Sequence, residues 1–157
     1  MNRDYFESRK DGKNGYGSAH FIVDLDGTIL QCIPNDEIAF HVGSSQVDPV
    51  SNKIYTDLAR EKFGVYAVDY VHQSPNSLTL GIEMTHKNDK GQFTDATYTA
   101  TVELAAKLLK DNGLSAESDL LRHYDIVGWK NCPRWFVDNE TEWTAFKDAV
   151  KAKMATM

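Results

Sequence analysis

His123, Lys130 and Cys132 lie close together in the sequence and carry side chains that could do chemistry as a group. The imidazole nitrogen and the cysteine thiolate are two of the ligand types that zinc prefers in proteins. An ammonium group two residues before the sulfur would suit metal-assisted attack on an amide, because it could stabilise a developing oxyanion. The spacing alone leaves three interpretations open: zinc ligands, a cysteine nucleophile with a histidine base, or residues without a shared function.

The backbone at Cys132 is restricted by the proline that follows it. Pro133 disfavours helical backbone at the residue before it. We therefore expect the Cys132 thiol to project from an extended segment that precedes a helix.

A glutamate within an alternating segment is the next candidate. Over residues 77–84, large apolar side chains alternate with small or polar ones. The apolar face consists of Leu78, Leu80, Ile82 and Met84. This period of two predicts a central β-strand with Glu83 on its other, sparsely filled face. In a cleft, partial burial would raise the pKa of this carboxyl group toward neutrality, which suits a general base that takes a proton from water. A solvent-facing carboxylate without a function is the alternative.

Two further histidines have surroundings that leave their roles open. His20 lies on a predicted strand, where it shares a face with Ile22 and Asp24. His41 lies just after a polar turn, in the sequence Phe-His-Val-Gly. Either one could be a structural histidine whose ring nitrogens are hydrogen-bonded inside the protein.

The helices and strands that must position these residues can be predicted from hydrophobic periodicity and from residues typical of helix ends and turns. Residues 3–10 are typical of the last turns of an amphipathic helix, and residues 18–34 of a β-hairpin that turns at Asp26 and Gly27. Residues 51–63 predict a helix with Ser51 as its N-cap and Gly64 as its end.

The second half of the chain predicts two longer helices. The longest covers residues 94–112, ends at Gly113, and should face the core with Val102, Ala105, Leu108 and Leu109. A strand is predicted within residues 120–126, and a closing helix from about Thr141 should carry Trp143, Phe146 and Val150 inward. Strands separated by helices predict the α/β class, with a mixed central β-sheet flanked by helices in a single domain over residues 1–157.

Composition excludes several classes of protein. A chain of 157 residues with 41% hydrophobic and 25% charged residues is typical of an ordinary globular protein. The net charge of -6 and the scattered lysines and arginines argue against nucleic acid as a partner. No apolar run approaches the ~20 residues of a membrane span, and the polar N-terminus has no signal-peptide core. We expect synthesis in the cytoplasm without classical export.

Four blocks of sequence together resemble a known family. Residues 17–31, 39–43, 80–83 and 123–133 are similar, in the same order, to the type 2 N-acetylmuramoyl-L-alanine amidases. That family includes phage endolysins and resembles the peptidoglycan recognition proteins. The resemblance extends over roughly residues 3–150 and implies an amidase-like α/β domain over the whole chain. It also implies that the substrate is bacterial peptidoglycan, hydrolysed at the amide between N-acetylmuramic acid and L-alanine.

The resemblance assigns roles to the candidate residues. His123 and Cys132 match the second and third ligands of a catalytic Zn²⁺ ion, and Glu83 matches the carboxylate that activates water. Lys130 matches the lysine that stabilises the tetrahedral intermediate, and His41 falls where a residue near the muramyl-peptide is expected.

The first zinc ligand of the family has no counterpart in this sequence. In the family it is a histidine on a strand before the helix that ends here near Arg9, and no histidine precedes His20. His20 is not usually a ligand in the family, but it is the one candidate for the missing position. A zinc site with two ligands would be weak and poorly fixed. We therefore expect either additional chain before Met1 or an altered metal site.

The expected function is that of a bacteriolytic endolysin. A phage or prophage amidase of this kind would degrade the cell wall after release through a holin-type pore. The rival expectation is a module that binds muropeptides without cleaving them, because its metal site is incomplete. The third possible function is that of a cysteine hydrolase that uses Cys132 and His123. The oligomeric state is left open by the sequence.

Overall fold

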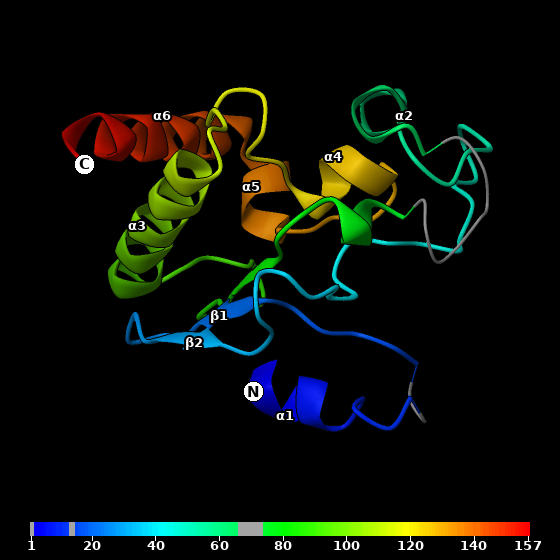
Figure 1. Cartoon of the computed structure of the whole chain (residues 1–157), viewed down its shortest axis with the longest axis horizontal. Coiled ribbons are helices and arrows are strands. Elements are labelled where there is room, and N and C mark those ends of the chain that lie inside the picture. The colour runs from blue at the N-terminus through cyan, green and yellow to red at the C-terminus, as the bar shows by residue number, and fades with distance from the viewer. Residues whose placement is uncertain (1, 13–14, 66–73) are drawn as a thin grey trace. The chain divides into compact units, whose positions relative to one another are not determined.

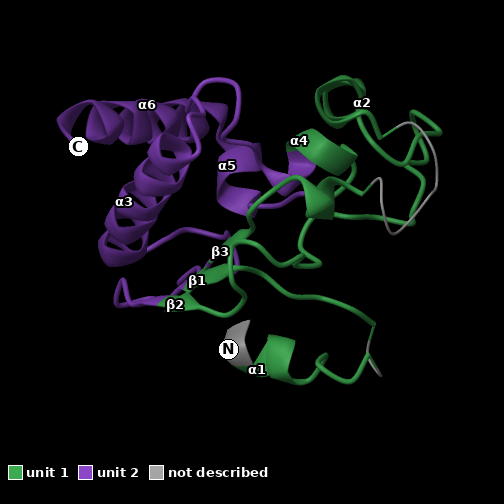
Figure 2. Ribbon diagram, viewed as in Figure 1, with its two compact units in different colours: residues 1–22, 30–83, 125–130 green, residues 23–29, 84–124, 131–157 purple. Residues whose placement is uncertain are grey.

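The computed structural model describes residues 2–12, 15–65 and 74–157. These residues form two compact units, each made of three chain segments (Figure 2). Unit 1 consists of residues 1–22, 30–83 and 125–130, and unit 2 of residues 23–29, 84–124 and 131–157. That the whole chain acts as one amidase-like domain stays a prediction. No helix within the described ranges is both long and apolar enough to cross a membrane.

The strands form a small mixed sheet in the order β2-β1-β3. It consists of β1 (Phe21–Val23), β2 (Ile29–Gln31) and β3 (Ile82–Met84) (Figure 1). β1 and β2 are antiparallel, since Asp24 N donates to Thr28 O at 2.9 Å and Cys32 N to His20 O at 2.8 Å. β3 is parallel to β1, since Phe21 N donates to Gly81 O and Thr85 N to Val23 O. The predicted α/β class with a mixed sheet is confirmed.

The hairpin turns where the sequence predicts it. Gly27 has a φ of +84°, which favours glycine, and its N–H donates to Asp24 O at 3.0 Å. The Asp26 carboxylate accepts a hydrogen bond from Thr28 N at 2.9 Å. Local turn chemistry therefore determines this connection.

The strand predicted over residues 77–84 is wrong in length and in place. β3 contains only Ile82–Met84, and Pro75–Ser77 form a short 3₁₀-helix, η1. Ser74 caps η1 by accepting a hydrogen bond from Asn76 N, so this local turn outweighs the alternation that follows it. β3 also lies at one end of the described sheet and not in its centre, which β1 occupies.

In unit 1 the helix α2 (Asp57–Phe63) starts later than predicted. Ser51 is not its N-cap, because its hydroxyl donates to the Asp48 carboxylate at 2.6 Å inside a separate turn. Thr56 caps α2 instead: its Oγ1 accepts from Ala59 N at 3.2 Å and donates to Asp125 O at 2.6 Å. The predicted end is confirmed, since Gly64 follows with a φ of +67°.

The strand predicted within residues 120–126 is also wrong. His123–Val127 form the short helix α4, which Gly128 follows with a φ of +79°. In unit 1 the carbonyl groups of Asp125 and Ile126 accept hydrogen bonds from Thr56. These carbonyl groups therefore have partners without a neighbouring strand. A further short helix, α1 (Asn2–Glu7), lies where the sequence predicts helix.

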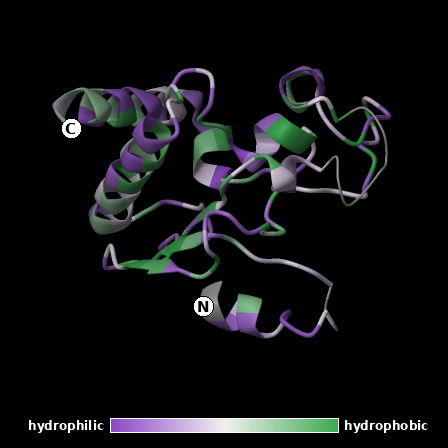
Figure 3. Ribbon diagram, in the orientation of Figure 1, coloured by the Kyte–Doolittle hydropathy of each residue, from purple (hydrophilic) through white to green (hydrophobic). Residues whose placement is uncertain are grey.

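Unit 2 is built on three helices with an aromatic core. They are α3 (Asp95–Asp111), α5 (Arg134–Asp138) and α6 (Glu140–Thr156). α6 packs against α3 and α5, and both long helices carry hydrophobic and hydrophilic residues (Figure 3). The Phe136 ring lies 5.0 Å from that of Phe146 and 5.4 Å from that of Trp143 between centroids. Of the residues predicted to face inward, Leu108 is only half-buried. The others are confirmed as buried: Val102, Ala105, Leu109, Trp143, Phe146 and Val150.

Candidate active site

Glu83 and Lys130 interact electrostatically within unit 1. Glu83 lies in the middle of β3 and is partly buried, and Lys130 is an exposed residue soon after α4. Burial raises the pKa of the Glu83 carboxyl above its usual value, and the Lys130 ammonium opposes this rise only in part. A carboxylate in this setting is a better proton acceptor than one in open water. The partial burial expected for Glu83 is therefore present, while the cleft around it and its catalytic role stay predictions.

His123 and Cys132 come from adjoining segments of unit 2. His123 is the first residue of α4, and Tyr124 N, directly after it, donates to Cys132 O at 3.0 Å. Cys132 precedes α5 in non-helical backbone, as Pro133 predicts, and both candidate ligands are half-buried. A backbone hydrogen bond thus holds the segments that carry the imidazole and the thiol next to each other.

A buried arginine fixes the segment in front of His123. The Arg122 side chain is only 8% exposed, and its Nη1 donates to Phe136 O at 2.9 Å and to the Glu140 carboxylate at 2.7 Å. Its guanidinium carbon lies 5.2 Å from the centre of the Trp143 ring. Arg122 therefore connects the start of α4 to α5 and α6. Sequence reasoning missed this residue; the signal was a charged residue directly after the apolar pair Leu120 and Leu121.

Replacing Arg122 by methionine should destabilise the protein by about 1–3 kcal/mol. Methionine keeps much of the aliphatic volume but leaves the buried Phe136 carbonyl without its donor. The Glu140 carboxylate is 68% exposed, so the loss of that ion pair should add little. Urea unfolding measures the change, and Lys151→Met, which breaks the exposed pair with Glu117, is the matched control. An equal unfolding midpoint for the two variants would contradict the role given to Arg122.

The structure gives His20 a structural role. Its Nδ1 accepts a hydrogen bond from Gly81 N at 3.0 Å, so the proton lies on Nε2, which donates to Glu37 O at 3.0 Å. The residue is 1% exposed. Because both ring nitrogens are used, no lone pair is left for a metal ion. This geometry argues against His20 as the missing zinc ligand.

The His41 ring is also held from both sides within unit 1. Its Nδ1 lies 2.9 Å from Ala39 O and its Nε2 2.8 Å from Thr79 Oγ1. Burial lowers its pKa to about 4, against the hydrogen bond to Ala39, so the ring is neutral near neutral pH. Because the Ala39 carbonyl oxygen can only accept, the proton of the neutral ring lies on Nδ1. Contact with a muramyl-peptide stays a prediction for this residue.

A single asparagine holds the loop that carries His41. Asn76 Oδ1 accepts hydrogen bonds from three successive backbone groups: His41 N at 3.1 Å, Val42 N at 2.8 Å and Gly43 N at 2.9 Å. Space beside the loop is tight, since a Cβ at Gly81 would fall 2.5 Å from the His41 ring. Sequence reasoning missed Asn76, although its place directly after Pro75 is a turn signal.

Comparison with known proteins decides the family. The model of the N-acetylmuramoyl-L-alanine amidase family matches residues 1–135, a range that contains all six candidate residues: His20, His41, Glu83, His123, Lys130 and Cys132. The chain belongs to this family. It is 34% identical over 140 residues to N-acetylmuramoyl-L-alanine amidase BlyA of Bacillus subtilis (strain 168). That match covers 89% of the chain but 35% of BlyA, so the chain spans about a third of the length of this relative. No solved structure matches the chain.

Amidases of this family are generally zinc-dependent, and the donor chemistry of two residues suits zinc. His123 and Cys132 offer an imidazole nitrogen and a thiolate, while a catalytic zinc usually has three protein ligands. Among the described residues, no group of three or more His, Cys, Asp or Glu side chains is placed to hold a metal ion. The described residues therefore fit part of a zinc site.

Four of the six candidate residues fall into two pairs, and the structure brings each pair together separately. Glu83 and Lys130 belong to unit 1, and His123 and Cys132 belong to unit 2. That the four side chains meet at one point stays a prediction.

Proposed function

We propose that this chain hydrolyses the amide bond between N-acetylmuramic acid and L-alanine in bacterial peptidoglycan. The observation that carries the proposal is the partly buried Glu83 beside Lys130, within the residues that match the amidase family. The name of the BlyA relative supports the same reaction. A general base and a cation that offsets the charge of the oxyanion both promote amide hydrolysis by water.

In the proposed reaction, water adds to the carbonyl carbon of the lactyl group. The Glu83 carboxylate takes a proton from the attacking water, and the Lys130 ammonium offsets the negative charge that develops on the carbonyl oxygen. The bond between this carbon and the alanine nitrogen then breaks, and Glu83 returns the proton to the leaving amine. The products are the free lactyl carboxylate and a peptide with an L-alanine amino terminus.

We also propose that the cofactor is Zn²⁺. His123 and Cys132 would hold it together with at least one further donor that is not among the described side chains. When bound, zinc supplies Lewis-acid catalysis for attack on an amide. The neighbouring segments of the two residues, joined by the bond from Tyr124 N to Cys132 O, support this pairing.

The cellular role that we propose is cell-wall degradation by a phage or prophage endolysin. The chain would be made in the cytoplasm without a signal peptide and would reach the wall after holin-type release. This part of the proposal rests on the family resemblance, and bacterial peptidoglycan is the partner.

The test is digestion of purified peptidoglycan, with mass spectrometry of the released peptides and metal analysis of the protein. We expect new L-alanine amino termini, about one zinc per chain, and loss of cleavage with a chelator that added zinc reverses. Cys132→Ser should lower zinc content and cleavage together. Cys32→Ser, at the other cysteine, is the matched control and should change neither.

Two other outcomes would replace the proposal. Retained muropeptide binding without zinc and without cleavage would show a binding module, which the partial donor set among the described residues favours as the second candidate. Cleavage that survives the chelator and is lost after thiol alkylation would show a cysteine hydrolase with Cys132 as nucleophile.

A further inference from the structure

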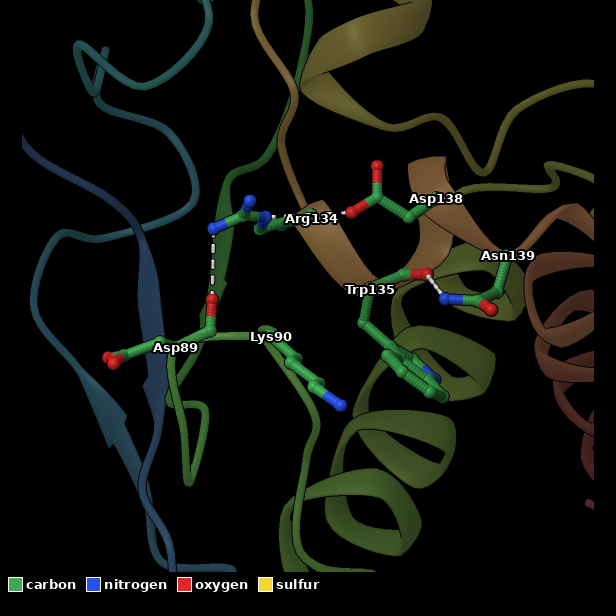
Figure 4. Close-up of a pocket in the computed structure, with 6 residues that line it drawn as sticks. All are labelled: Asp89, Lys90, Arg134, Trp135, Asp138 and Asn139. Carbon is green, nitrogen blue, oxygen red and sulfur yellow. Dashed lines mark hydrogen bonds and ion pairs between the residues drawn. The ribbon is translucent and has the colours of Figure 1, made fainter.

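Unit 2 contains a pocket of about 420 Å³ that the proposed reaction does not use. One wall comes from the loop between β3 and α3, and the other from α5 and the residue that follows it (Figure 4). The lining residues are Asp89, Lys90, Arg134, Trp135, Asp138 and Asn139. This volume lies within the range of small-molecule sites, which is about 300–1,000 Å³.

The loop wall of the pocket is held in one conformation. Lys87 N donates to Gln92 O at 2.7 Å, and Asn88 Oδ1 accepts from both Lys90 N and Gln92 N. Gly91 lies directly against α5, since a Cβ there would fall 3.0 Å from the backbone nitrogen of Trp135. A pocket with fixed walls loses little entropy when a ligand binds.

The charges around the pocket cancel. Two aspartates face one lysine and one arginine, which gives a formal charge of zero. Arg134 is already paired, because its Nη1 donates to Asp89 O at 2.9 Å and its Nε lies 3.5 Å from the Asp138 carboxylate. Such a pocket has no excess charge with which to attract a strongly anionic or cationic ligand.

The groups that face the pocket combine an aromatic ring with hydrogen-bonding groups. Trp135 is half-buried, and the Lys90 side chain extends toward it from the opposite wall (Figure 4). Within the described part of the chain, no ion pair engages the Lys90 ammonium, so it can donate to a ligand. Asn139 Nδ2 donates to Trp135 O, which leaves its Oδ1 as an acceptor. An indole ring beside an ammonium donor and an amide acceptor, in a pocket without net charge, suits an uncharged ring with one apolar face and several hydroxyl groups.

We propose that this pocket is a saccharide subsite that binds an N-acetylated amino sugar of the glycan strand. The sugar ring packs on Trp135, while Lys90 and Asn139 hydrogen-bond its polar groups. The saccharide class follows from the pocket itself; the choice of the peptidoglycan glycan rests on the proposed function.

The test measures binding of N,N′,N″-triacetylchitotriose to the whole chain by calorimetry. We expect Trp135→Leu, which keeps apolar bulk but removes the ring face, to weaken binding about tenfold, a loss of ~1.4 kcal/mol. Lys90→Ala should weaken it about threefold, whereas Lys87→Ala, on the same loop but outside the pocket, should not change it. Lys90 is exposed, so its variant keeps the test valid if Trp135→Leu fails to fold.

A parallel assay separates this proposal from the proposed function. Chitotriose has no lactyl amide, so its binding does not depend on catalysis, and hydrolysis is followed separately on muramyl dipeptide. No binding by the natural chain, or equal binding by the natural chain and both pocket variants, overturns the subsite even if hydrolysis is intact. Binding that both variants weaken supports the subsite even if no hydrolysis occurs. Binding of a free anionic stem peptide at Lys90 in place of chitotriose also overturns it.

Discussion

Glu83→Gln should reduce the rate of amide hydrolysis by about 10²- to 10⁴-fold and leave the folded chain at least as stable near neutral pH. Glutamine has the size of glutamate but cannot accept a proton from water. Burial raises the pKa of Glu83 in the folded chain above its unfolded value. The folded state thus binds the proton more tightly, and this contribution to stability is lost as pH rises through the raised pKa. Removing the charge should therefore not cost stability above that pH.

A large loss of rate without a loss of stability is the signature of this prediction. The rate is measured by release of L-alanine-terminated peptide, and stability by urea unfolding at pH 4 and pH 7. Glu61→Gln is the matched control, because Glu61 is an exposed carboxylate on α2 in the same unit. It should change neither quantity. If Glu83→Gln hydrolyses the amide at the rate of the natural chain, Glu83 is not the general base.

The pH dependence of the rate is a second test of Glu83 as the general base. If Glu83 acts as the base, the rate should rise with pH through its raised pKa and then level off on that side. The residual rate of Glu83→Gln should lack this rise. If the rate of the variant still rises with pH in the same way, the rise belongs to the titration of another group.

Asn76→Ala should destabilise the protein by about 3 kcal/mol or more. The substitution leaves the N–H groups of buried Val42, half-buried His41 and exposed Gly43 without their shared acceptor. Each unsatisfied buried donor costs about 1–3 kcal/mol, although water can replace part of the loss. Since whole domains are stable by about 5–15 kcal/mol, the effect should be a large shift of the urea midpoint.

Two variants sharpen the Asn76 prediction. Asn76→Asp keeps an acceptor oxygen for the three N–H groups and should lose less stability than Asn76→Ala. Asn35→Ala, at an exposed asparagine of the same unit, should leave the midpoint nearly unchanged. Equal midpoints for Asn76→Ala and Asn35→Ala would show that the three hydrogen bonds contribute nothing to the fold.

Local signals predicted much of the fold because their causes lie within a few residues. The turn at Asp26 and Gly27 depends on one positive φ and one nearby carboxylate. α3 begins after a threonine that caps it, since Thr94 Oγ1 accepts from Thr97 N at 3.0 Å. Helical periodicity likewise predicted which residues of α6 are buried.

Two errors in the sequence predictions, at the start of α2 and at α4, lie where distant residues decide the local structure. The start of α2 depends on Thr56, which bonds to carbonyl groups of Asp125 and Ile126 far along the chain. The segment of residues 120–126 is so short that periodicity cannot separate a strand from a helix. Tertiary hydrogen bonds resolve that choice in favour of α4.

By itself, the sequence determined the family, the α/β class and the side chains that could do the chemistry, because these depend on residue type, order and period. Only the tertiary structure decided which ring nitrogens of His20 are already used, that Asn76 and Arg122 hold the loops beside His41 and His123, and that Lys90 and Trp135 line one pocket. Each of these facts is a contact between residues distant in sequence. Such contacts depend on how the folded backbone brings the residues together, which no local pattern records.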